Sequence, residues 1–116
     1  MDSIVAKKAF AFAVRIVKMN RYLRSIDCDR ALCSQLLRSG TSIGANIEEA
    51  LCGQSKKDFI AKLSIAQKEC RETMYWLRLL YEGAELDERY FQSIYPEAEE
   101  LYKMVSSIII SSKNNS

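Results

Sequence analysis

The sequence contains no histidine among its 116 residues. Without an imidazole, the chain cannot assemble a Ser-His-Asp or Cys-His nucleophile arrangement, nor the Glu-x-x-His motifs of di-iron bundles. A phosphate-cradling glycine loop is also missing, because Gly40 and Gly44 have the wrong spacing and no Gly-Lys-Ser/Thr follows them. We therefore predict that the protein is not an enzyme, and we expect no cofactor and no small-molecule substrate.

Metal-binding and membrane-spanning patterns are missing as well. No pair of the four cysteines has the C-x-x-C spacing of a thiolate zinc site. An all-carboxylate site without histidine would bind Mg²⁺ or Ca²⁺ only weakly, so we interpret four candidate carboxylates as solvated or paired: Glu48, Glu49, Glu69 and Glu72. The chain has no apolar run of about 18 residues for a membrane span, and no pattern of a secretion signal. We predict no metal and no membrane partner, and we expect a cytoplasmic protein.

Glycine and proline are scarce, at four and one residues, although a β-rich chain of this length needs many turns. Apolar residues instead recur at spacings of three and four, which is typical of amphipathic helices, over residues 3–25, 30–52, 56–82 and 87–111. Short links make successive helices antiparallel neighbours. We predict one all-α domain over residues 1–116, an antiparallel up-down-up-down four-helix bundle, with a kink near Pro96 or a restart capped by Ser93.

Polar residues mark where these helices begin. Asp27 or Asp29 is expected to cap the second helix, Ser55 the third and Asp87 the fourth. Gly53 is expected to take the left-handed conformation that often ends a helix.

The second helix has an unusual centre of small residues. Residues 39–46 include two glycines, which lower helix propensity, yet the apolar spacing continues through them. Small residues allow another backbone to approach closely, so we predict a packing role for this stretch. If Asn46 is buried it needs a hydrogen-bond partner, and Glu69 or Glu72 across the helix pair is a candidate.

Charge is unevenly distributed although the net charge is only +2. Residues 1–26 carry six basic side chains against Asp2, a net charge of +5, whereas residues 85–103 carry six acidic against two basic ones, a net charge of −4. This segregation describes either two solvated faces or a basic surface for phosphate, and the two segments could also meet in an oligomer.

An aromatic and basic stretch lies on the third helix, with Tyr75, Trp76 and Tyr81 near Arg71 and Arg78. Aromatic rings beside arginines can stack on single-stranded RNA, but they are more often core or interface residues. Trp76 falls outside the main apolar stripe, so we predict that it lies at a subunit interface.

Four runs resemble the bacterial four helix bundle proteins, also called 23S rRNA intervening-sequence proteins: residues 37–50 (LRSGTSIGANIEEA), 55–63 (SKKDFIAKL), 65–73 (IAQKECRET) and 75–80 (YWLRLL). The resemblance implies a ring-like homopentamer with an RNA-associated role. Some members are encoded inside inserted segments of large-subunit ribosomal RNA genes, and a similar group serves diversity-generating retroelements by engaging RNA and a reverse transcriptase. No catalytic residue is carried over. The structural motif falls on Gly40, Ser42, Gly44, Asn46 and Glu49.

Two functional hypotheses follow. The first is an RNA-binding homo-oligomer whose candidate contacts lie on the first helix: Lys7, Lys8, Arg15, Lys18, Arg21 and Arg24. Lys56, Lys57 and Lys62 are weaker candidates. The alternative is a scaffold or adaptor that binds protein and no nucleic acid. The two differ in whether the basic residues of the first helix face solvent together or are neutralised by the fourth helix.

Overall fold

The structure is a computed structural model that describes residues 3–83 and 85–115. It contains four helices: α1 (Ile4–Ser25), α2 (Arg30–Leu51), α3 (Lys56–Glu82) and α4 (Glu88–Asn114). Across the described ranges there is no β-strand, which confirms the all-α prediction. The predicted helix bounds differ from the observed ones by three residues at most, at the C-terminal end of α4.

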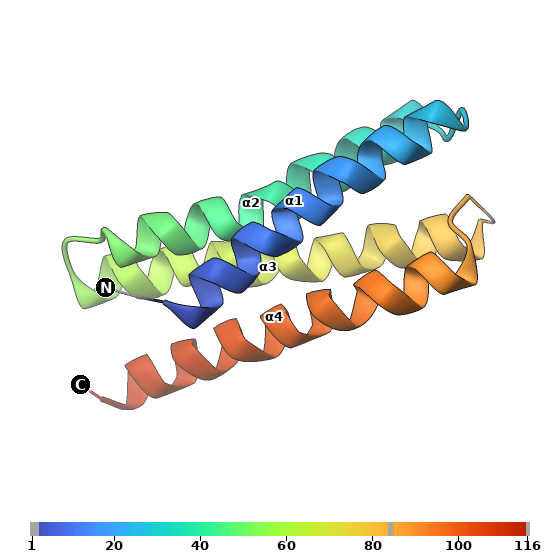
Figure 1. The fold of residues 1–116 in the computed structure, drawn as a ribbon. Helices are drawn as coiled ribbons and strands as arrows, with labels where there is room; N and C mark the ends of the chain where they lie inside the picture. Colours follow the sequence, from blue (N-terminus) through green and yellow to red (C-terminus); the bar gives the residue numbers. More distant parts are fainter. Residues whose placement is uncertain (1–2, 84, 116) are drawn as a thin grey trace.

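Successive helices run in opposite directions, with the connecting loops at alternating ends of the bundle (Figure 1). Side-chain contacts agree with this arrangement. Lys8 of α1 contacts Glu100 of α4, whereas Arg15 contacts Glu97, so the partner number falls as the α1 number rises. Each helix packs most closely on its neighbours in sequence, and of the helix pairs in contact α1 and α4 touch least.

A side-chain oxygen caps the start of every helix by accepting a hydrogen bond from a backbone N–H, as a capping residue does. The caps are Ser3, Asp29, Ser55 and Asp87. The predictions for Ser55 and Asp87 are confirmed, and Asp29 rather than Asp27 caps α2. The prediction for Gly53 is wrong, because the one left-handed residue within the described chain is Asp27, with φ of 58°.

The core follows the predicted apolar stripes. Phe12 and Ile16 of α1, Ile43 of α2 and Leu77 of α3 are almost fully removed from solvent. Burial of each such side chain contributes about 1.5–3 kcal/mol relative to exposure. The stripes therefore fix which face of each helix points inward and which face stays available for function.

The glycines of α2 lie against α1. A Cβ atom on Gly40 would lie 2.8 Å from Ile16 Cγ1, closer than packed carbon atoms approach. A Cβ atom on Gly44 would lie 3.5 Å from Ala9, at an ordinary packing distance. The small residues at the centre of α2 thus serve the close approach of α1, and Gly40 is the position that requires it.

Helix α4 continues through Pro96 without interruption. The alternative prediction, a restart capped by Ser93, is therefore wrong. Proline cannot donate its backbone hydrogen bond and disturbs the carbonyl groups of the preceding turn. Tertiary contacts from α1 reach that turn and are described below.

Candidate nucleic-acid interface

Two of the six candidate cations of α1 are neutralised by α4. Lys8 Nζ lies 3.1 Å from Glu100 Oε1, and Arg15 Nη1 lies 2.5 Å from Glu97 Oε2. Between these pairs lies a concavity of about 250 Å³ that Phe12 also lines. The basic segment and the acidic segment therefore meet in part within a single chain.

Arg15 also binds the turn that precedes Pro96. Its Nη2 donates to Ser93 Oγ at 3.0 Å, and its Nη1 approaches the Ser93 carbonyl oxygen at 3.4 Å. Pro96 has no N–H to pair with the Gln92 carbonyl oxygen, and Arg15 supports this turn by binding the adjacent Ser93 without replacing that hydrogen bond. Arg15 is thus a structural residue that holds α1 to α4.

The remaining cations toward the C-terminal end of α1 are different. Lys18, Arg21 and Arg24 are exposed, and none of their side chains forms an ion pair or hydrogen bond with any other described residue. Their spacing of three residues places successive members on adjacent turns of one helix side. We call these three residues the α1 basic strip.

Three of the four other predicted basic residues, Lys7, Lys56 and Lys62, make interactions of their own. Lys62 Nζ lies 3.2 Å from Glu49 Oε1, which places Glu49 of the family motif in an α2–α3 ion pair. Lys56 donates to the carbonyl oxygen of Asn115. Lys7 is exposed and makes an interaction of its own, and Lys57 is exposed.

Exposed apolar side chains share the outer surface of α1. Phe10 is 63% exposed, and Val14 and Val17 are each more than one-third exposed. Their spacing of four and three residues continues to Arg21 and Arg24 and marks one side of the helix. The outer face of α1 is therefore apolar along its first half and basic at its end.

Asn46 does not bridge α2 and α3 as its sequence position suggested. Its side chain is half-buried, and Nδ2 donates at 2.8 Å to the Ser42 carbonyl oxygen of its own helix. It forms no hydrogen bond with Glu69 or Glu72. The polar groups that join these two helices are others.

Arg38 joins α2 to α3. Its Nη1 lies 2.8 Å from Glu69 Oε2, its Nη2 contacts Glu72, and its Nε donates to Gln35 at 3.3 Å. The Glu69 side chain is only 9% exposed, so this carboxylate depends on the guanidinium for compensation. The sequence contained a signal, because Glu69 and Glu72 are three residues apart and share a helix side, but their cation was missed.

Trp76 is attached to the same group of residues. Its ring is half-buried and its Nε1–H donates to Glu72 Oε1 at 3.3 Å. Tyr75 packs edge-on against it, with ring centroids 5.3 Å apart, and is 48% exposed. Trp76 therefore lies at the edge of the exposed surface of α3, where its hydrogen bond to Glu72 holds it in place.

Two further buried hydrogen bonds join α2 to its neighbouring helices. Thr73 Oγ1 donates to Ser39 Oγ at 2.9 Å between α3 and α2. Asn20 Nδ2 donates to the Cys33 carbonyl oxygen at 2.7 Å between α1 and α2. Neither hydrogen bond was predicted from the sequence, although Asn20 is a polar residue that interrupts an apolar stripe and could have been singled out for that reason.

Burial controls the chemistry of two thiols. Burial raises the pKa of Cys28 to about 12, and the neighbouring Cys33 adds to that shift. Burial also raises the pKa of Cys70 to about 12. A thiol with such a pKa stays protonated at neutral pH and is a poor nucleophile or metal ligand. In residues 3–83 and 85–115, no group of three or more metal-ligating side chains converges.

Membrane insertion finds no support in the described helices, since none combines the length and apolarity needed to cross a bilayer. The fold and surface define a class: a small all-α four-helix bundle with paired charges at its seams and unpaired cations at one end.

The chain belongs to the 23S rRNA-intervening sequence protein family, whose model matches residues 1–107. This confirms the resemblance noted in the sequence. A protein of unknown function from the S23 ribosomal protein family of Bacteroides thetaiotaomicron VPI-5482 has the same fold, with a TM-score of 0.89 and 45% identity. That match covers 91% of this chain and 98% of the Bacteroides chain. No curated protein matches the sequence.

Proposed function

We propose that the protein is a non-enzymatic, cytoplasmic homo-oligomer that associates with RNA through the α1 basic strip. The observation that carries the proposal is that Lys18, Arg21 and Arg24 are exposed and lack acidic partners among the residues described. Lys8 and Arg15, by contrast, are neutralised by α4. The strip is thus the part of the basic segment that keeps its charge available for phosphate.

Oligomerisation would strengthen a modest protomer charge. The net charge of one chain is +2, and repeating the strip around a ring adds the fields of several copies. A homopentamer is the assembly that the family resemblance implies. Phosphate contacts release counterions from the nucleic acid, so the affinity of such an assembly falls steeply with salt.

Exposed aromatic side chains on α1 and α3 are candidates for contacts between subunits. Phe10 on α1 and Tyr75 on α3 are 63% and 48% exposed, and the half-buried Trp76 borders Tyr75. Aromatic residues are enriched in protein interfaces. We assign the outer surface of α3 around Trp76 to the subunit interface.

The proposal is tested by RNA binding across a salt series, with the oligomer mass measured on the same sample. We expect an oligomer that binds single-stranded RNA, with log affinity falling linearly in log salt concentration by about 0.7 per phosphate contact. A well-formed oligomer that binds no RNA at low salt would contradict the proposal.

One observation favours a second candidate, a protein scaffold or adaptor without nucleic-acid binding. The ion pairs of Lys8 and Arg15 with α4 remove part of the basic field, and Phe10 offers an apolar contact beside it. A scaffold would hold a protein partner with little dependence on salt. The salt series distinguishes the two candidates directly.

A further inference from the structure

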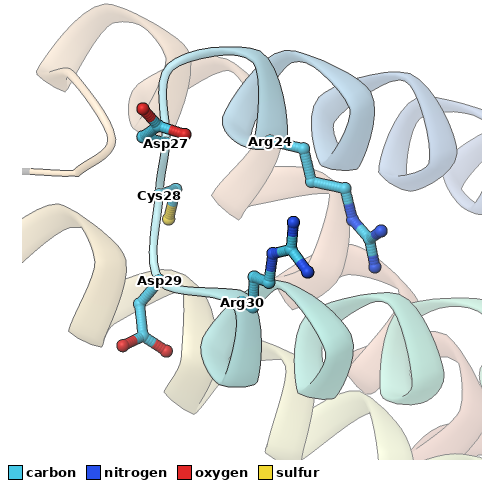
Figure 2. Close-up of a pocket in the computed structure, with 5 residues that line it drawn as sticks. All are labelled: Arg24, Asp27, Cys28, Asp29 and Arg30. Carbon is cyan, nitrogen blue, oxygen red and sulfur yellow. The ribbon is translucent and has the colours of Figure 1, made fainter.

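The loop between α1 and α2 forms a concavity at one end of the bundle. Its volume is about 400 Å³, and it is lined by Arg24, Asp27, Cys28, Asp29 and Arg30. Figure 2 shows the side chains of Arg24 and Arg30 extending toward the same space from the end of α1 and the start of α2. Two guanidinium groups therefore face one concavity from different helices.

The nearby carboxylates do not compensate these arginines. Asp29 Oδ1 accepts a hydrogen bond from the Leu32 backbone N–H, which commits it to the start of α2. In Figure 2 the carboxylates of Asp27 and Asp29 both lie apart from the two guanidinium groups, and that of Asp29 points away from them. The side chains of Arg24 and Arg30 form no ion pair or hydrogen bond with any part of the chain that the structure describes.

This arrangement opposes two electrostatic preferences. Like charges that share a site repel each other, and a cation at the first residue of a helix faces the positive end of the helix dipole. Arg30 is the first residue of α2, where the Asp29 carboxylate caps the helix but forms no ion pair with Arg30, and no acidic residue follows in the first turn. Residues that break local rules without an internal compensation are expected at functional sites.

We propose that Arg24 and Arg30 form a binding site for a phosphodiester group of RNA. The inference rests on the proposed function and names a contact of the same surface, since Arg24 also belongs to the α1 basic strip. A phosphate offers oxygens that match the planar fork of a guanidinium, and one anion between two guanidinium groups removes their repulsion. Arg30, which lies outside the first helix, is the new residue in this assignment.

The test compares double variants of the full-length oligomer in binding a short single-stranded RNA. Arg24→Gln/Arg30→Gln removes the site, and Arg24→Lys/Arg30→Lys keeps the charge but removes the fork. Lys68→Gln/Lys103→Gln removes two exposed charges, one from α3 and one from α4, and serves as the matched control. We expect the glutamine pair to lose about tenfold or more in affinity and to flatten the log–log salt slope by about 1.4, which corresponds to two contacts. The lysine pair should keep the slope and lose affinity, and the control should change little.

The outcomes separate this inference from the proposal beneath it. If the glutamine pair and the control lose the same RNA affinity relative to the wild type, the Arg24–Arg30 site is overturned and RNA association still stands. Wild-type protein that binds no RNA would overturn both. Titration with inorganic phosphate distinguishes a free anion from the RNA backbone, because phosphate bound as tightly as RNA would contradict the assignment. The thermal midpoint of the glutamine pair should equal or exceed that of the wild type, which separates lost binding from lost folding.

Discussion

One arginine of α2 and one of α1 are used in opposite ways, although the two helices pack against each other. Arg38 of α2 is bound to Glu69 and Glu72 of α3, and the buried Glu69 depends on it. Arg24 of α1 has no partner among the residues described and faces solvent. The comparison teaches that residues 37–50, which carry part of the family resemblance, serve helix packing. The end of α1, in contrast, carries positive charge that no ion pair within the described chain neutralises.

The largest expected effect on stability is at Arg38. We expect Arg38→Ala to lower the free energy of unfolding by about 2 kcal/mol, because Glu69 is left buried without its cation and solvent around the half-exposed arginine moderates the loss. Chemical denaturation measures the change. Arg24→Ala is the matched control and should change stability by less than about 0.5 kcal/mol. Equal losses at the two positions would remove the distinction between architectural and available arginines.

The next effect separates the two glycines of α2. Gly40→Ala places a Cβ atom 2.8 Å from Ile16 Cγ1, and we expect a net loss of about 1 kcal/mol, since overpacking outweighs the gain in helix propensity. Gly44→Ala meets Ala9 at 3.5 Å and should stabilise the protein by about 0.5–1 kcal/mol. Thermal unfolding of both variants gives the signs, and two changes of the same sign would contradict the packing at Gly40.

A smaller effect is expected where α1 meets α4. Arg15→Gln removes the contacts with Glu97 and Ser93 beside Pro96 and should cost about 1 kcal/mol, because these side chains are partly exposed. Lys8→Gln removes a more exposed pair and should cost under about 0.5 kcal/mol. A double-mutant cycle of Arg15 with Glu97 measures the coupling energy. A coupling energy of zero would show that the two side chains are close together without stabilising the fold.

The smallest expected effect at neutral pH is on the reactivity of the cysteine thiols, which reports how tightly the surrounding residues pack. Cys52 is exposed and should react promptly with a thiol reagent in the native protein, whereas Cys28, Cys33 and Cys70 should be protected. Because burial raises the pKa of Cys28 and Cys70 to about 12, the folded state favours their protonated forms. Their contribution to stability is complete below about pH 9 and is lost as the pH rises toward 12. Rapid labelling of Cys28 at neutral pH would show that the loop beside Arg24 is open.

Much of the fold was predictable because the periodicity of apolar residues decides which face of a helix is buried. The four helices were predicted to within three residues at each end, and the caps at Ser55 and Asp87 followed from local chemistry. Sequence could not show that Asn46 bonds the Ser42 carbonyl oxygen of its own helix instead of reaching α3, because whether it faces α3 depends on the rotation of α2 about its axis. The pairing of Arg38 depends on the register of α2 against α3, which no local signal fixes.

The candidate interface was only partly predictable for the same reason. Six cations on α1 were visible in the sequence, but which of them α4 neutralises depends on how closely α1 and α4 approach. Lys8 and Arg15 lie on the side that meets α4, while the α1 basic strip does not. Arg30 was not recognised, since its position beside Arg24 arises only when the loop reverses the chain.

The most direct test of the account compares two double variants of α1 that each remove one lysine and one arginine. Lys18→Gln/Arg21→Gln alters the unpaired cations, and Lys8→Gln/Arg15→Gln alters the paired ones. Binding of single-stranded RNA is measured for both across a salt series. We predict that the first variant loses about tenfold or more in affinity, with a log–log salt slope flatter by about 1.4, and that the second keeps the wild-type slope. Equal losses in both variants, or no loss in the first, would contradict RNA association through the α1 basic strip.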